Sequence, residues 1–462
     1  MPEADALVTA LELAREYLTG LHRRRVGGTA HLARLQAAFS HPLSDEGTDA
    51  AGVVRGLARA VDPGLVASAG PRFFGFVTGG TLPAALAADW LTSVWDQNAG
   101  LYVESPAASV VEDVVAVWLL ELLGLPETAS VGFVTGGQMA NFTCLAAARR
   151  AVLLAAGWDV EDRGLSGAPP VNVVVSADAH VTVFTALQLL GLGAGRARRV
   201  PTDAQGRIRP SELRGVLDTC GGPTIVCAQA GEVNTGSFDP FEEIAAVSRE
   251  YEAWLHVDGA FGLWAAASPR RRHLVTGVSL ADSWATDAHK MLNSPYDSGL
   301  AIVRSGDVHR AALTKTVAYL PSGGADRRDP CDYTPESSRR ARGFSVYAAL
   351  RALGRRGVGE LVDRYCDLAR LMAERLGTAP NTEILNDVVF NQVLVRFRSP
   401  LGEEAGAFTQ RVIAAVQEEG TCWLGGTTWR GERAMRISVC NWSTTPADIE
   451  QSADSILRAA GG

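Results

Sequence analysis

Apolar runs of strand length alternate with amphipathic stretches between about residues 130 and 305. The runs consist largely of residues that favour strands, and they lie at 131–136, 171–176, 224–229, 253–260 and 300–305. The stretches between them carry apolar residues at helical spacing, at 139–156, 181–192 and 239–253. Strands that are apolar on both faces and alternate with helices are typical of a mostly parallel sheet with helices on each side. The pattern therefore predicts an α/β fold.

The chain before and after this region has a different character. Residues 1–55 are expected to be a helical segment that wraps a partner subunit, and residues 56–340 a large domain that carries the sheet. Residues 341–462 are expected to be a small α+β domain. Its predicted elements are a long helix pair at 344–376, strands at 389–397 and 434–440, and a helix near 405–419.

One segment of the large domain lacks any periodic pattern. Residues 319–340 are rich in glycine, proline and charged side chains. Such a composition is typical of an irregular connection rather than of a helix or a strand. We expect this segment to be a mobile loop.

Composition and charge exclude several classes of protein. The chain of 462 residues is 47% hydrophobic and 20% charged, as expected of a globular protein with a large core, and its net charge of −8 argues against nucleic-acid binding. Apolar stretches such as 114–125 are too short to span a membrane, and the first residues do not resemble a signal peptide. The seven scattered cysteines are expected to be buried free thiols in a reducing cytoplasm, with no metal site.

Lysine is almost absent from the chain. Of the 43 basic residues only Lys290 and Lys315 are lysines. A guanidinium stays charged, whereas an amine can lose its proton and attack an aldehyde to form an imine. Lys290 follows the strand-like run 281–286 and precedes an apolar segment, which is an unfavourable setting for the alternative, a surface lysine. No chemical task is evident for Lys315.

Side chains that can bind a ligand or take part in catalysis follow the predicted strands. Ligands of parallel sheets bind at these carboxyl ends of the strands. The residues concerned are the turn Gly136-Gly137-Gln138, then His180, Asp258 and Lys290. Glycines at a helix start suit a phosphate, and an acid that ends an apolar strand requires a cation. Taken singly, each has a structural alternative, namely a tight turn, a hydrogen-bonding histidine, a helix cap and a surface amine. One ligand needs all four, and that ligand is an aromatic aldehyde with a phosphate and a protonated ring nitrogen.

The combination of HVDGA (256–260) with DSWATDAHKMLNSPYDSG (282–299) resembles the pyridoxal-phosphate-dependent group II amino-acid decarboxylases. The resemblance covers roughly residues 50–455. It implies the fold-type-I transferase scaffold, in which a mostly parallel, seven-stranded type of sheet is flanked by helices and joined to a small C-terminal α+β domain. It also implies pyridoxal 5'-phosphate as the cofactor, an amino acid as the substrate, and a homodimer.

The resemblance also implies roles for individual residues. Lys290 would form the Schiff base with the cofactor, and Asp258 would keep the ring nitrogen protonated. His180 and Ala260 would pack on the two faces of the ring. The phosphate would be held by Gly136, Gly137, Gln138 and His289.

Four further residues match family positions farther from the cofactor. Tyr333 matches a loop tyrosine that protonates the carbanion after carbon dioxide leaves, and its alternative is an exposed tyrosine. Arg436 matches an arginine that meets the substrate carboxylate in some members, and its alternative is a structural ion pair. Phe74 and Phe76 fall in the region that lines the substrate pocket, and their alternative is a core role.

Two positions depart from the family pattern. The segment Gly231–Thr235 stands where the family commonly has Gly-Thr-Thr, which leaves a threonine contact with the cofactor's ring oxygen open. Glu232 in this segment is either a pocket residue that alters substrate or reaction choice, or a solvated loop acid. Met291 replaces a tryptophan that is frequent after His-Lys, and we interpret it as a packing change.

The sequence therefore predicts a cytoplasmic, homodimeric enzyme that decarboxylates an L-α-amino acid, with Tyr333 or His180 as the proton donor to carbon. Two rival reactions use the same cofactor site. Oxygen that intercepts the carbanion would make the protein an aldehyde synthase, and loss of a β-substituent would make it a C–S lyase. A third class is an inactive cofactor-binding or interaction protein. The presence of competent residues at all four cofactor positions argues against it.

Overall fold

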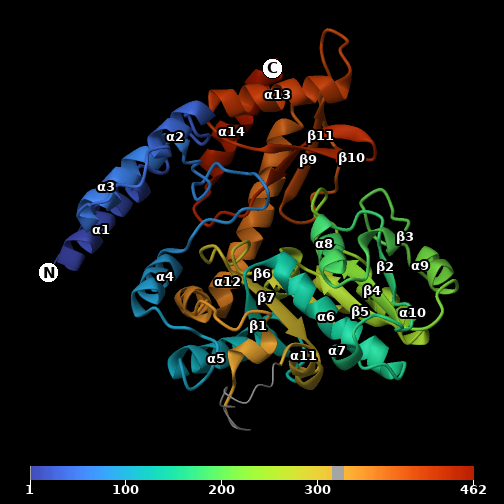
Figure 1. Ribbon diagram of the computed structural model, residues 1–462. Helices are drawn as coiled ribbons and strands as arrows, with labels where there is room; N and C mark the ends of the chain where they lie inside the picture. Colours follow the sequence, from blue (N-terminus) through green and yellow to red (C-terminus); the bar gives the residue numbers. More distant parts are fainter. Residues whose placement is uncertain (1, 315–326, 462) are drawn as a thin grey trace. The chain divides into compact units, whose positions relative to one another are not determined.

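The computed structural model describes residues 2–314 and 327–461, which form two compact units (Figure 1). One unit comprises Met1–Thr78, Leu371–Ile384 and Val395–Gly462, so it is assembled from both ends of the chain. The other comprises Gly79–Arg370 and Leu385–Leu394. Residues 319–326 of the predicted mobile loop, and Lys315, lie outside the described residues.

The second unit is built around a seven-stranded sheet. Its strands are β1 (Ser130–Val134), β2 (Asn172–Ser176), β3 (Arg198–Val200), β4 (Thr224–Gln229), β5 (Trp254–Asp258), β6 (Ser283–Asp287) and β7 (Gly299–Val303). They follow the order β1-β7-β6-β5-β4-β2-β3, and β7 runs antiparallel to both of its neighbours while the other pairings are parallel. The carboxyl ends of β1, β2, β5 and β6 therefore share one edge of the sheet. β4, β6 and β7 are buried at every position, as expected of a sheet that is covered on both faces.

Helix α6 (Gly137–Ala155) lies across β5, β6 and β7, as Figure 1 shows. Together with α8 (Val181–Leu189) it closes a hydrophobic core over β2 and β4. The other helices that begin in this unit are α4 (Pro83–Trp95), α5 (Pro106–Leu123), α7 (Val160–Arg163), α9 (Pro210–Leu217), α10 (Phe241–Glu250), α11 (Gly306–Leu313) and α12 (Gly343–Leu376). Gly354 breaks α12 with a non-helical backbone at φ 61°, so α12 is the helix pair that the sequence predicts.

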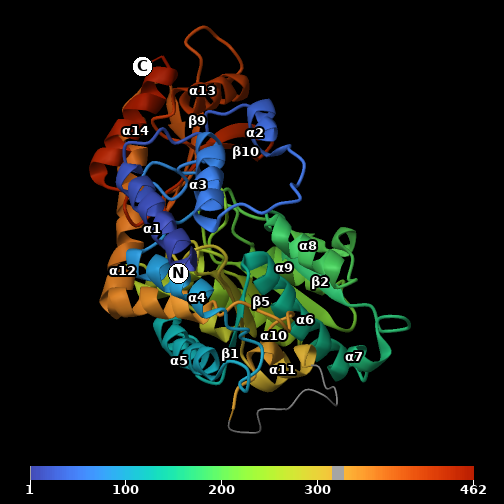
Figure 2. The ribbon, with the colours of Figure 1, turned by 60° about the vertical axis from the view of Figure 1, so that its left-hand side comes forward.

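The first unit combines N-terminal helices with a smaller sheet. Its helices are α1 (Pro2–Gly20), α2 (Leu32–Phe39), α3 (Ala50–Val61), α13 (Ala405–Glu419) and α14 (Pro446–Ala459), and α1 packs against α3 (Figure 2). Its strands are β8 (Thr382–Ile384), β10 (Gly425–Trp429) and β11 (Glu432–Ser438), with the second half of β9 (Gln392–Phe397), in the order β10-β11-β9-β8. Among the described helices, none has both the length and the apolar character that a membrane crossing requires.

The predicted strands of the large sheet are confirmed, and the exceptions have a physical reason. Strand β3 is missing from the prediction because it has only three residues, two of them arginines, and pairs with β2 alone at the edge of the sheet. Strand β10, which contains two glycines and two threonines, likewise lacks an apolar run. An edge strand needs little burial, so it leaves little hydrophobic signal in the sequence.

A buried ion pair ties α5 to the segment before α12. Glu112 lies 2.8 Å from Arg339, and each side chain is at most 1% exposed. Arg339 also donates hydrogen bonds to the backbone carbonyls of Ala99 and Phe133, at 2.6 Å and 2.8 Å. One guanidinium therefore connects three segments of the second unit.

Removal of one partner of this pair is expected to destabilise the protein strongly. Arg339→Met should lower the free energy of unfolding by about 3–5 kcal/mol, because the carboxylate of Glu112 would stay buried without compensation. Urea unfolding followed by circular dichroism measures the change. The double variant Glu112→Leu with Arg339→Met is the control and should recover a large part of the loss. A loss of less than about 1 kcal/mol in the single variant would contradict the argument.

Candidate active site

The strand-end residues singled out in the sequence lie along the carboxyl edge of the seven-stranded sheet. Gly136 precedes α6 directly after β1, and His180 is the residue that caps the start of α8 after β2. Asp258 is the last residue of β5, and Lys290 lies in the turn after β6. Because β5 and β6 are paired neighbours, Asp258 and the Lys290 turn are adjacent in the sheet.

The Lys290 amine is paired with a carboxylate that the sequence analysis did not single out. Nζ of Lys290 lies 2.9 Å from Oδ2 of Asp287, the last residue of β6. Burial by itself would lower the pKa of Lys290, but the adjacent charge and hydrogen bond of Asp287, with Asp258 farther away, raise it above its usual value. The Lys290 side chain is only 18% exposed. It is therefore not a surface lysine. The spacing of three residues within one turn was the available signal for Asp287.

Asp258 is held in place by neutral donors. Nδ2 of Asn141 donates to Oδ2 of Asp258 at 3.0 Å, and the backbone N–H of Ala260 donates to Oδ1 at 3.2 Å. Behind Asn141, Nε2 of His256 lies 2.8 Å from Oδ1 of Asn141, and Nδ1 lies 2.9 Å from Oγ of Ser283. The amide oxygen can only accept, so Nε2 carries the proton. Burial lowers the pKa of His256 to about 4, which keeps the ring neutral near pH 7.

Neutral hydrogen-bond donors therefore orient the Asp258 carboxylate, and Lys290 acts on its charge only from beyond ion-pair distance. Asp258 is 5% exposed, and within residues 2–314 and 327–461 no lysine or arginine lies within the 4.0 Å of an ion pair. A buried carboxylate with only neutral partners is costly. A cationic ring nitrogen beside it would remove that cost, so the site fits a protonated aromatic nitrogen. Asn141 and His256 are functional candidates that the sequence analysis missed, although His256 begins the quoted HVDGA motif.

The start of α6 forms an open cradle beside Asp287 and His289. A Cβ atom on Gly137 would lie 2.9 Å from Oδ2 of Asp287, and one on Gly136 would lie 3.1 Å from Cε1 of His289. A side chain at either position would fill this space. The first N–H groups of an α-helix have no partner within the helix, so they can donate to an anion here. Gln138, at the next position, is exposed.

His180 is joined to the Asp258 network through one hydroxyl group. Nδ1 of His180 lies 2.9 Å from Oγ1 of Thr182 and accepts the backbone N–H of Thr182 at 3.4 Å. Nδ2 of Asn141 donates to the same hydroxyl oxygen at 3.2 Å. His180 is therefore both a helix cap and a neighbour of the residues that hold Asp258.

Tyr333 is placed on another part of the sheet. It ends the short turn Pro330–Tyr333, and its ring lies edge-on to that of His309, with 5.3 Å between the ring centres. Nδ1 of His309 lies 2.8 Å from Oγ of Ser130, the first residue of β1. The described structure thus places Tyr333 near the amino end of β1, whereas Lys290 lies beyond the carboxyl ends. It does not bring the two residues together within one chain.

Phe74, Phe76 and Arg436 belong to the first unit. Phe74 is buried, and its backbone N–H donates to the carbonyl of Trp423 at 2.7 Å. Phe76 is 67% exposed, and its ring centre lies 5.3 Å from that of Trp423. Arg436 is half-buried in β11. Their contact with a substrate stays a prediction.

Glu232 is not a solvated acid. Its side chain is buried and accepts the backbone N–H groups of Asn234 and Thr235 at 2.8 Å and 2.7 Å. Nδ2 of Asn234 also donates to it at 2.8 Å. The interpretation as a solvated acid is therefore wrong, because the buried carboxylate closes its own turn after β4, and an effect on substrate or reaction choice stays a prediction. Met291 is fully buried, in agreement with a packing change.

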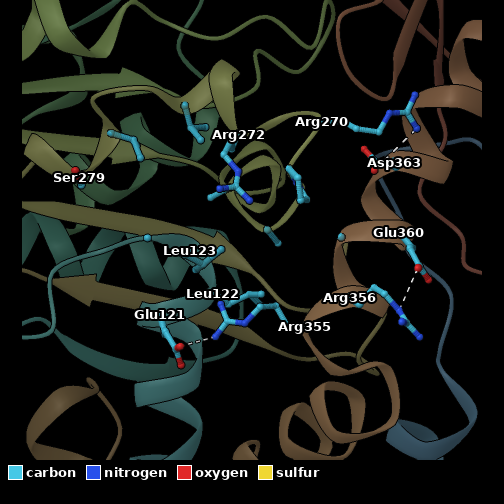
Figure 3. Close-up of a pocket in the computed structure, with 17 residues that line it drawn as sticks. Glu121, Leu122, Leu123, Arg270, Arg272, Ser279, Arg355, Arg356, Glu360 and Asp363 are labelled. Atoms are coloured by element: carbon cyan, nitrogen blue, oxygen red, sulfur yellow. Dashed lines mark ion pairs between the residues drawn. The ribbon is translucent and has the colours of Figure 1, made fainter.

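A cavity of about 820 Å³ lies at the end of α5 and beside α12 (Figure 3). Figure 3 shows three of its four arginines paired with acids, namely Arg355 with Glu121, Arg356 with Glu360 and Arg270 with Asp363. None of the cofactor-binding candidates lines it. Most of its charged side chains pair with one another, whereas Asp258 at the carboxyl edge has no direct ion pair among the described residues.

Comparisons with known proteins identify the family of the chain. The family model described as the pyridoxal-dependent decarboxylase conserved domain matches residues 34–399. An aromatic-L-amino-acid decarboxylase of Bacillus atrophaeus is 26% identical over 454 residues, which are 96% of this chain and 92% of that protein. A 4-hydroxyphenylacetaldehyde synthase of Rhodiola rosea is 27% identical over 379 residues, 79% of this chain and 76% of that protein. The crystal structure of Oryza sativa TDC with PLP and tryptamine has a TM-score of 0.92 at 23% identity, covering 99% of this chain and 97% of that one.

The chain belongs to the pyridoxal-dependent decarboxylase family. It has the fold of that family, and it is a pyridoxal-phosphate-dependent carboxy-lyase of the amino-acid decarboxylase class. The residues at the carboxyl edge fit this cofactor. The amine of Lys290 suits its aldehyde, the carboxylate of Asp258 suits its ring nitrogen, and the start of α6 suits its phosphate.

Proposed function

We propose that the protein removes carbon dioxide from an L-α-amino acid and releases the corresponding amine. The observation that carries the proposal is the presence, at one edge of the sheet, of the buried Lys290 amine and of a buried Asp258 with only neutral partners. An amine there can hold an aldehyde, and the carboxylate can stabilise positive charge on a ring. The family relationship supports the same reaction.

Pyridoxal phosphate, when bound, supplies an aldehyde that condenses with amines and a protonated ring that accepts electrons. The task of Asp258 is to hold the proton on the ring nitrogen, and Asn141 keeps its carboxylate oriented for that task. The stabilisation acts where charge develops, and the group that supplies it is already in place. We assign the binding of the phosphate to Gly136, Gly137 and the first N–H groups of α6. We assign the two faces of the ring to His180 and Ala260, as the family resemblance implies.

Product analysis tests the proposed reaction. Purified, cofactor-loaded protein is incubated in air with pooled L-amino acids and cysteine conjugates, and the products are identified by mass spectrometry. We expect an amine that is smaller than its parent amino acid by carbon dioxide, which would also identify the substrate. A free thiol with pyruvate would instead assign the protein to the β-eliminating lyases.

An aldehyde synthase is the second candidate, because one relative carries the name 4-hydroxyphenylacetaldehyde synthase. In that reaction molecular oxygen takes the electrons of the carbanion. The same incubation separates the two candidates, since an aldehyde synthase would release an aldehyde in air and lose that product without oxygen. Amine formation that is equal with and without oxygen would exclude the second candidate.

Tyr333 and His180 remain the two candidates for the proton donor to carbon. If Tyr333 donates the proton, Tyr333→Phe should divert product from amine to aldehyde, because an unprotonated carbanion survives long enough to meet oxygen. The ratio of amine to aldehyde measures this effect. His180→Gln is the matched comparison at the carboxyl edge. An unchanged amine yield in Tyr333→Phe would leave Tyr333 with a packing role, against His309 and under the guanidinium of Arg328.

We also propose that the protein is a homodimer and that it acts in the cytoplasm. Two neighbouring helices of the second unit support a dimer, because each exposes large apolar side chains, Trp90, Leu91, Val94 and Trp95 on α4 and Val110, Val114 and Val117 on α5. Such exposed apolar faces are typical of contacts with another protein surface. The described cysteines are all free thiols, which agrees with a reducing compartment. Light scattering in solution tests the dimer.

A further inference from the structure

Asp287 lies between Lys290, His289 and the glycines at the start of α6. Its Oδ2 lies 2.9 Å from Nζ of Lys290, and its Oδ1 lies 3.4 Å from Nε2 of His289. Oδ1 is buried and accepts no hydrogen bond from the described residues. Both carboxylate oxygens also face the cradle of glycines at the start of α6, with Oδ2 2.9 Å from where a Cβ on Gly137 would lie. The carboxylate is thus close both to the amine and to the anion site.

In the ion pair with Asp287, Lys290 is an ammonium ion, which must lose a proton before it can react. An ammonium ion has no free electron pair, so its proton must leave before the nitrogen can attack an aldehyde. Burial excludes bulk water from most of this side chain, since Lys290 is only 18% exposed. The proton therefore needs an acceptor within the site, within hydrogen-bond reach of Nζ.

The other titratable groups around Lys290 are less suited to accept its proton. Nδ1 of His289 already accepts the backbone N–H of Ser298 at 3.2 Å, and burial together with the nearby lysine lowers the pKa of His289 although Asp287 opposes this. Asp258 accepts from Asn141 and Ala260 and lies beyond ion-pair distance. Two more groups face this region from the next turn, Tyr296, which stacks on His289, and Asp297, which pairs with Arg342.

We propose that Asp287 controls the proton of Lys290: its charge holds the proton on Nζ while the anion site is empty, and it accepts that proton when an anion at the start of α6 disfavours its own charge. In the forward step an N–H bond of the ammonium group breaks, an O–H bond forms on Oδ2, and the electron pair stays on nitrogen. Asp287 is a positioning residue that acts through Lys290. The inference deepens the proposed role of Lys290 and rests on it, but it can be tested without turnover.

The proton transfer has a consequence for the anion site. Transfer makes Asp287 neutral, and so removes a negative charge from the cradle where α6 offers its first N–H groups. An anionic phosphate and a charged Asp287 would repel each other there. Release of the Lys290 proton to Asp287 and capture of the phosphate are therefore mutually favourable.

Competitive labelling of lysine tests the proposal directly. The chain contains only two lysines, so Lys315 serves as an internal reference for Lys290. Full-chain protein freed of cofactor is labelled with trace acetic anhydride between pH 7 and about pH 11, a range that brackets ordinary lysine titration, and both sites are quantified by mass spectrometry. We expect Asp287→Asn to raise the labelling of Lys290 relative to Lys315 at pH 8 by about tenfold or more. Asp454→Asn, a matched change at an exposed ion pair in the first unit, should leave the ratio unchanged.

A second measurement uses the cofactor-loaded enzyme. The visible absorption of the cofactor held by Lys290 changes with the protonation of the nitrogen, and Asp287→Asn should lower the pH midpoint of that change by about one unit or more. A labelling ratio within about twofold of the wild-type ratio, in a variant with wild-type circular dichroism, would overturn the proposal. Should Asp287→Asn fail to fold, the wild-type protein decides alone, because a Lys290 midpoint below the ordinary value of about 10.4 would also overturn it.

Discussion

Lys290→Ala protein is expected to bind no cofactor covalently, to lack the visible absorption band of the wild type, and to lose several orders of magnitude in kcat. The reason is chemical. Arginine cannot form an imine at neutral pH, and Lys315 is the one other lysine in the chain. Absorption spectra of protein purified with added pyridoxal phosphate measure the first effect, and single-turnover assays measure the second.

Two variants control this experiment. Lys290→Arg keeps a positive charge that can pair with Asp287, so it should fold as the wild type does and still lack the band. Lys315→Ala removes the other lysine and should keep the band. An unchanged band in Lys290→Ala would remove Lys290 from the site and with it the proposed reaction.

Asp258→Asn is expected to keep the cofactor attached but to lower kcat by about a hundredfold or more, a loss comparable to that of one well-placed electrostatic group. The amide is nearly isosteric with the carboxylate, but it cannot hold a proton on the ring nitrogen. The ring would then accept electrons poorly at the moment that carbon dioxide leaves. Steady-state kinetics, with the visible band as a check on cofactor content, measure the effect.

The neighbouring Asn141 provides a graded comparison. Asn141→Ala removes the 3.0 Å hydrogen bond to Asp258 but leaves its charge, so its effect on kcat should be smaller than that of Asp258→Asn. The link from His256 to Asn141 would be lost as well, which leaves a buried acceptor and donor unpaired. A kcat for Asp258→Asn within about threefold of the wild type would show that ring protonation does not limit the reaction.

The two carboxylates near Lys290 have different partners and therefore different tasks. Asp258 has only neutral partners and awaits a cation, whereas Asp287 already has one in the Lys290 ammonium group. Loss of Asp258 should therefore appear in the chemical step. Loss of Asp287 should appear in the protonation of Lys290, a quantity that can be read without any substrate.

The sequence by itself determined the α/β class, most strands of the large sheet, and the placement of Gly136, His180, Asp258 and Lys290 at its carboxyl edge. These features depend on local periodicity and on the rule that parallel strands end on one side, and both are visible in one dimension. The motifs within residues 256–299 resemble those of a known family, and this resemblance also predicted the cofactor.

The tertiary structure alone decided which side chains touch. Asn141 reaches Asp258 from a helix 117 residues away in sequence, and His256 supports Asn141 from the strand that also ends in Asp258. Asp287 lies close to Lys290 in sequence, but only the turn after β6 shows that their side chains meet. Only the folded chain shows that Glu232 is buried against the N–H groups of its own turn and that the ring of Tyr333 packs on that of His309. Hydrogen bonds and ion pairs depend on distances of a few ångströms in the folded chain, and no periodic pattern in a sequence encodes those distances.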